Sequence, residues 1–176
     1  DAEKCLKERG VDTEISIPDA FHKAESMKPP RRGIVILGDP GSGKTTHLKR
    51  LLLWCLRGGL AKLGLPEKLI PVFLPLRYLE DLESGLDAFI QSQLSDPMLE
   101  TSPSFGKRLL ERGDLLFLLD GLDEVVEPAH RREVSRWIGK ALTLYPDCRF
   151  VVTCRFAGYT EEARLDAEFL EMHMRP

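Results

Sequence analysis

A glycine-rich stretch at residues 38–45 has the spacing of a phosphate-binding loop. It reads Gly-Asp-Pro-Gly-Ser-Gly-Lys-Thr and fits the P-loop pattern Gly-x-x-x-x-Gly-Lys-Ser/Thr. Glycines allow backbone angles at which successive N–H groups point at phosphate oxygens, and a helix that begins here adds the positive end of its dipole. We expect Lys44 to reach the β- and γ-phosphates and the Thr45 hydroxyl to bind Mg²⁺. The predicted nucleotide-binding residues are Gly38, Asp39, Pro40, Gly41, Ser42, Gly43, Lys44, Thr45 and Thr46.

The segments on either side of this loop support the interpretation. Ile34–Leu37 is a continuous apolar run, which is typical of a strand buried on both faces of a parallel sheet. His47–Arg57 predicts a helix that Gly58-Gly59 ends. A P-loop needs this strand before it and this helix after it. The alternative is a Gly-rich turn with an idle lysine.

A second group of chemical residues follows the apolar run Leu115–Leu119. Asp120 ends this predicted strand, which places its carboxylate at the carboxyl edge of the sheet beside the P-loop, where it can hold Mg²⁺. Asp123 and Glu124 follow closely enough to orient or polarise a water molecule that attacks the γ-phosphate. Either acid is a candidate for this catalytic role. The alternative is an acidic helix start before Pro128, where carboxylates favour the helix dipole.

A third candidate, Arg155, follows the predicted strand Phe150–Thr153. Strand ends in such sheets face the ligand crevice, so Arg155 is predicted to contact the γ-phosphate. The alternative is a surface arginine paired with Glu161 or Glu162.

Strands alternate with amphipathic helices along the chain, which predicts a three-layer α/β fold around a mainly parallel sheet. Leu69–Leu76 is expected at an edge, because Pro71 and Pro75 cannot donate to a neighbouring strand. In Pro128–Leu144, apolar residues recur at helical spacing. The remaining predicted elements are a fifth strand at Phe169–Met174 and helices at Asp19–Ser26, Leu86–Leu94 and Phe105–Arg112. We assign residues 1–32 to an N-terminal flank or linker and residues 33–176 to the core.

Composition limits the function classes. The chain has 176 residues, of which 43% are hydrophobic and 30% charged, and this suits one globular domain. A net charge of −3 gives no general attraction to nucleic acid or to anionic membranes. Cys5, Cys55, Cys148 and Cys154 form no Cys-x-x-Cys pair, and Cys55 and Cys154 lie in apolar runs, as core cysteines do. We expect a cytoplasmic protein without a membrane-spanning segment.

Three motifs together resemble the NACHT NTPases, which belong to the STAND class of signal-transduction ATPases. The segments Gly38–Thr46, Leu116–Glu124 and Val151–Arg155 are similar to the Walker A, Walker B and sensor 1 motifs. Asp-Gly-Leu-Asp-Glu at residues 120–124 is the most specific of them, since a small residue follows the first aspartate. The resemblance covers about residues 30–175, and the style of the sequence is closer to bacterial than to vertebrate members.

The resemblance implies a five-stranded sheet in the order 5-1-4-3-2. It also implies binding of Mg²⁺ with ATP or GTP, with a preference for ATP, together with nucleotide-dependent switching and self-association within a longer protein. In the family, helical and winged-helix domains follow the core and complete the nucleotide pocket. We expect the chain to be truncated before these domains, so that its own turnover is slow and weak.

The main hypothesis is therefore a slow Mg²⁺-dependent NTPase that acts as a signalling switch. An alternative is a nucleotide-binding scaffold without significant hydrolysis. An AAA+-like motor on DNA would favour a basic or aromatic surface, and a small-molecule kinase has less use for Asp123 and Glu124. The sequence contains no asparagine, which excludes the Asn-Lys-x-Asp motif of Ras-like GTPases, and it lacks the Ser-Gly-Gly signature of ABC ATPases.

Overall fold

The described part of the chain forms five parallel strands in one sheet. The computed structural model describes residues 16–79, 81–94, 102–165 and 168–174. The strand order is β2-β3-β4-β1-β5, and every neighbouring pair is parallel. This is the predicted order 5-1-4-3-2 seen from the other edge, so the predicted sheet is confirmed. The strands are β1 (Gly33–Leu37), β2 (Ile70–Pro75), β3 (Leu115–Asp120), β4 (Arg149–Cys154) and β5 (Phe169–His173).

The inner strands owe their place to continuous apolar runs. β1 and β3 are buried along their whole length. Residues of β1 alternate between the two sides of the sheet, so Ile34 and Ile36 join one core while Val35 and Leu37 join the other. β2 lies at the edge, as its two prolines predict, because an edge strand needs fewer N–H donors.

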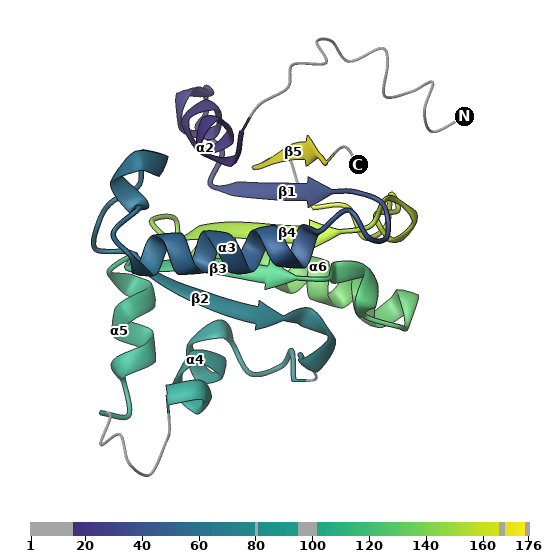
Figure 1. Cartoon of the computed structure of the whole chain (residues 1–176). Helices are drawn as coiled ribbons and strands as arrows, with labels where there is room; N and C mark the ends of the chain where they lie inside the picture. Colours follow the sequence, from purple (N-terminus) through teal and green to yellow (C-terminus); the bar gives the residue numbers. More distant parts are fainter. Residues whose placement is uncertain (1–15, 80, 95–101, 166–167, 175–176) are drawn as a thin grey trace.

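Helices cover both faces of the sheet, which confirms the three-layer fold (Figure 1). On one face, α2 (Ile17–Ser26) and α3 (Lys44–Leu56) bury residues such as Phe21, Leu48 and Leu51. The opposite face is covered by α4 (Leu86–Leu94), α5 (Phe105–Glu111) and α6 (Pro128–Leu144). The apolar stripe predicted for α6 is buried, and it comprises Val134, Trp137, Ile138, Ala141 and Leu142.

Two helices begin earlier than the sequence pattern indicates. α2 begins at Ile17, because Ser16 and Asp19 form a reciprocal capping box. α3 begins at Lys44 rather than His47, since its first turn is polar and shows no apolar periodicity. α2 packs against β1 and β5, within the same core as α3. The boundary between residues 32 and 33 stays a prediction.

Short 3-10 helices follow three of the strands at their carboxyl ends. They are η2 (Leu76–Tyr78) after β2, η3 (Leu122–Glu124) after β3 and η4 (Phe156–Gly158) after β4, whereas η1 (Leu60–Leu63) follows α3. η2 packs against η3, and η3 packs against η4. Because parallel strands end at the same edge, these segments line one side of the sheet next to the phosphate loop.

Cys55, Cys148 and Cys154 are buried free thiols, and the core positions predicted for Cys55 and Cys154 are confirmed. Cys5 lies outside the described residues. Within the described ranges, none of the helices is long and apolar enough to cross a bilayer.

Candidate functional site

The phosphate loop joins β1 to α3 in a backbone conformation that only glycine adopts without strain. Gly41 and Gly43 have φ angles of 80° and 84°, in the left-handed region. Gly43 precedes α3, and no side chain caps the first turn of this helix. The backbone N–H groups of that turn therefore face the loop and offer an anion-binding site.

Lys44 turns back over its own loop. Its Nζ donates to the carbonyl oxygens of Gly38 and Asp39 at 2.8 and 2.9 Å, and it lies 3.3 Å from the Ser42 hydroxyl. These oxygens hold the Lys44 ammonium group within the phosphate loop. The charged oxygens of a bound phosphate would be stronger acceptors for this group than the loop carbonyls are. Asp39, Pro40 and Gly41 are exposed, so the loop is open to solvent.

Asp120 is the centre of a small oxygen cluster. Its side chain is only 4% exposed, and Oδ1 accepts from the Thr45 hydroxyl at 3.2 Å and from the Thr153 hydroxyl at 2.6 Å. The Thr153 oxygen in turn accepts the Gly121 N–H at 2.8 Å. The end of β3 is thereby connected to both α3 and β4.

This cluster has the chemistry of a magnesium site. A hydroxyl and a carboxylate are hard oxygen ligands, and Mg²⁺ takes one or two protein carboxylates together with phosphates and waters. Among the described residues, His, Cys, Asp and Glu side chains form no group of three or more that could bind a metal without such partners. Thr45 and Asp120, which were predicted as the metal ligands, lie within hydrogen-bond distance of each other. The donor set fits the ion.

Asp123 and Arg155 are paired with each other. Asp123 Oδ1 accepts the backbone N–H of Arg155 at 2.9 Å, and Oδ2 lies 3.1 Å from the Arg155 Nε. The Asp123 side chain is 10% exposed and packs against Gly158, where an added Cβ would lie 2.4 Å from the Asp123 Cβ. Both oxygens of Asp123 are therefore engaged by Arg155.

Glu161 and Glu162, the alternative partners for Arg155, form ion pairs with other arginines. Glu162 pairs with Arg132, and Glu161 lies 3.9 Å from Arg164. Within the described residues, the half-exposed Arg155 is paired with Asp123 in place of either glutamate.

Glu124 folds back over Gly121 and is paired with Arg77. Gly121 has a φ of 76°, and a Cβ there would lie 2.9 Å from the Glu124 Cδ. Besides this contact with Gly121, the Glu124 side chain forms an ion pair between its Oε2 and Arg77 Nη1. The Arg77 guanidinium also lies 4.8 Å from the centre of the Tyr78 ring. Its pKa is raised above the ordinary value by hydrogen bonding to Tyr78 and by Glu124.

Arg131 fixes the turn that carries both acids. From α6 its guanidinium donates to the Val125 carbonyl at 2.8 and 3.1 Å and to the Asp123 carbonyl at 3.3 Å.

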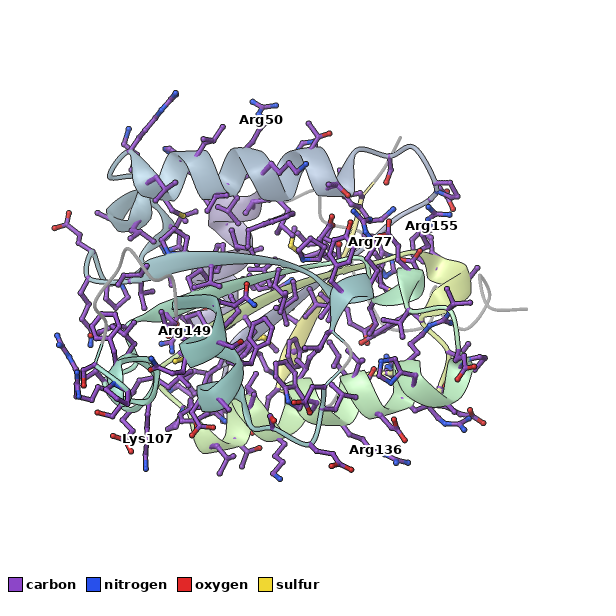
Figure 2. The ribbon with its side chains drawn as sticks, turned by 90° about the horizontal axis from the view of Figure 1, so that it is seen from below. Arg50, Arg77, Lys107, Arg136, Arg149 and Arg155 are labelled. Carbon is purple, nitrogen blue, oxygen red and sulfur yellow. The ribbon has the colours of Figure 1, made fainter. Side chains whose placement is uncertain are left out.

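Figure 2 shows Arg77 and Arg155 at the end of the molecule where α3 begins, whereas Arg149 and Lys107 lie towards the opposite end. The candidate residues after β3 and β4 thus lie at one sheet edge with the phosphate loop.

A comparison with protein-family profiles matches residues 32–175 to the NACHT domain. The chain belongs to the NACHT family. A search of curated proteins gave no match. The matched range agrees with the resemblance seen in the three motifs, and NACHT domains are nucleotide-binding NTPase modules.

The structure of this NACHT domain brings the predicted residues together and adds two. Thr153 bonds directly to Asp120, and Arg77 binds Glu124. Neither was singled out from the sequence. For Thr153 a signal existed, because it is the polar residue that ends an otherwise apolar strand. For Arg77 the clues were its position after an edge strand and the similarity of the segment Pro71–Arg77 to NACHT sequences.

Proposed function

We propose that this NACHT domain is the Mg²⁺-dependent ATPase core of a signalling switch. The observation that carries the proposal is the buried Asp120 carboxylate, which accepts the hydroxyl of Thr45 at the start of α3. A carboxylate and a hydroxyl in this place beside a phosphate loop suit a nucleotide bound with a divalent cation. The resemblance favours ATP over GTP.

In this proposal the loop and the ion divide the charge of the nucleotide. Loop N–H groups and Lys44 hold the phosphates, and Thr45 and Asp120 hold Mg²⁺. When bound, the ion supplies positive charge that stabilises the phosphate oxygens during transfer. Asp120 is kept in place by the Thr153 hydroxyl, so its carboxylate is preorganised for this role.

The two acids after Gly121 take different roles. We assign the orientation of the attacking water to Glu124, because its side chain is 31% exposed and lies over Gly121 next to Asp120. Asp123 is engaged on both oxygens by Arg155, which suits a residue that orients the arginine. Arg155 is 48% exposed and is proposed to contact the γ-phosphate.

Asp120→Asn tests the metal site. The variant should weaken Mg²⁺-dependent ATP binding far more than binding without Mg²⁺, because the carboxylate acts through the ion. Calorimetric titration of ATP with and without Mg²⁺ measures this difference. Equal losses under both conditions would mean that Asp120 does not contact the metal.

The alternative is a scaffold in which bound nucleotide is structural and hydrolysis is irrelevant. Glu124→Gln separates the two functions, because it should preserve Mg²⁺-dependent binding while reducing hydrolysis to a slow residual rate. The switch predicts that this variant changes nucleotide-dependent self-association, which light scattering can follow in ATP and in ADP. A scaffold predicts the same self-association for Glu124→Gln and wild type in either nucleotide.

A further inference from the structure

Glu124, the catalytic acid of the proposed function, is paired with a residue that lies outside the Walker A, Walker B and sensor 1 motifs. Glu124 lies on η3, after β3, whereas Arg77 lies on η2, after the edge strand β2. The ion pair between them is a contact across 47 positions of sequence. It joins the outermost strand of the sheet to the acid that would orient water.

Two contacts limit where the Glu124 carboxylate can lie. The Glu124 side chain packs on Gly121, where an added Cβ would lie 2.9 Å from the Glu124 Cδ. Arg77, which follows β2, binds one of the two carboxylate oxygens of Glu124, Oε2. In the described part of the chain, Glu124 is paired with Arg77 through Oε2, and its side chain is 31% exposed, so Oε1 can accept a hydrogen bond from a water molecule.

The orientation of the Arg77 side chain is fixed by a second contact, apart from its ion pair with Glu124. Its guanidinium stacks on the Tyr78 ring, and β2 ends at Pro75, directly before η2. Arginine presents a planar fork that fixes the direction of a bound carboxylate, which a lysine ammonium does not do. The geometry suits a residue that sets the orientation of Glu124.

We propose that Arg77 is the positioning residue for Glu124 in ATP hydrolysis. The inference rests on the proposed function, in which Glu124 orients the attacking water. Arg77 holds one carboxylate oxygen towards β2, so that the other faces the nucleotide side of the sheet edge. Loss of Arg77 should leave the phosphate loop and the Asp120 cluster intact, because their hydrogen bonds within the described residues do not involve Arg77.

Single-turnover hydrolysis of radiolabelled ATP with Mg²⁺, with the protein in excess, tests this role. The rate constant reports the chemical step even when turnover is slow, and varying the protein concentration gives the Kd. Arg77→Gln should lower the rate constant about ten- to a hundredfold, as expected for a misplaced catalytic group. The Kd should stay within about twofold of wild type. Arg77→Lys should lower the rate constant by a smaller factor, because lysine keeps the positive charge although it lacks the planar guanidinium group.

A double-mutant cycle separates positioning from a merely structural effect. In a Glu124→Gln background, Arg77→Gln should cause no further loss of rate, since the group that it positions is already absent. Arg132→Gln is the matched control, because Arg132, on α6, forms a comparable exposed pair with Glu162, which follows β4. This control should hydrolyse ATP at the wild-type rate.

Three results would overturn the proposal. They are a wild-type rate in Arg77→Gln, an equal loss of rate in the Glu124→Gln background, and a loss of affinity as large as the loss of rate. Absence of hydrolysis by the wild-type chain is a different result, because it contradicts the proposed function and the role of Arg77 with it. A wild-type chain that hydrolyses ATP beside an unaffected Arg77→Gln variant contradicts the role of Arg77 alone.

Discussion

Replacing Thr153 by valine tests how the Asp120 cluster is built. Valine keeps the shape of threonine but removes a hydroxyl that donates to Asp120 Oδ1 at 2.6 Å and accepts from the Gly121 N–H at 2.8 Å. Thr153 is 1% exposed, so water cannot replace either bond without a rearrangement. An unsatisfied buried donor costs about 1–3 kcal/mol, and a bond to a charged group contributes about 1.5–3 kcal/mol.

The two effects overlap, and we expect Thr153→Val to lower the free energy of unfolding by about 2–4 kcal/mol. For a chain of this size each kcal/mol shifts the Tm by roughly 2–4 °C, so the Tm should fall by about 4–16 °C. Urea denaturation and differential scanning calorimetry measure the two quantities. ATP affinity in Mg²⁺ should fall as well, because Asp120 loses a support.

Thr143→Val is the control for this measurement. Thr143 is an exposed residue of α6 whose hydroxyl donates to the Gly139 carbonyl at 3.1 Å, away from the sheet edge. Removing an exposed hydroxyl should change the stability by less than about 0.5 kcal/mol. If Thr153→Val is no more destabilising than Thr143→Val, the bonds to Asp120 and Gly121 do not hold the site together.

Three further predictions concern other parts of the molecule. Asp114→Ala removes a buried carboxylate that lies 2.9 Å from Lys68 and 2.8 Å from Arg112; it should cost about 1–3 kcal/mol in urea denaturation, because the exposed cations can turn to water, with unchanged nucleotide affinity. An exposed-pair control, Lys107→Ala, should cost less than about 1 kcal/mol, and equal costs would contradict the argument. Gly158→Ala should push η4 away from Asp123 and lower both Tm and ATP affinity, whereas wild-type values for both would show that η4 yields without consequence. Burial raises the pKa of the Cys55 and Cys148 thiols to about 11 and that of Cys154 to about 12. The unfolded thiols ionise first, so the stability that these thiols contribute should be complete below their ordinary pKa of 9.0 and fall as pH rises towards 11–12. Denaturation between pH 8 and 11 measures this, and a flat profile would contradict it.

The strands and the phosphate loop were predictable because their signals are local. A strand buried on both faces must be apolar at every position, as β1 and β3 are, and this gives unbroken runs that a half-exposed strand would lack. The prolines of β2 likewise report an edge. In the phosphate loop, Gly41 and Gly43 adopt positive φ angles, so their identity follows from backbone geometry alone.

The contacts among the strand ends were not predictable in the same way. Thr153 is 33 positions from Asp120, and Arg77 is 47 positions from Glu124, so each pairing depends on which strands are neighbours. The resemblance supplied the strand order, but not the side-chain partners. The division between Asp123, bound by Arg155, and Glu124, bound by Arg77, required the positions of η2, η3 and η4 together.

Calorimetric titration of ATP, in the presence of Mg²⁺, into wild type and Lys44→Ala tests the central assignment most directly. Within the described residues, the hydrogen bonds of Lys44 all lie inside the phosphate loop, so the variant should fold with an unchanged Tm. Loss of a charge-assisted contact of about 1.5–3 kcal/mol should weaken ATP binding about ten- to a hundredfold. A folded Lys44→Ala protein that binds ATP with wild-type affinity would contradict the assignment of residues 38–45 as the phosphate-binding loop.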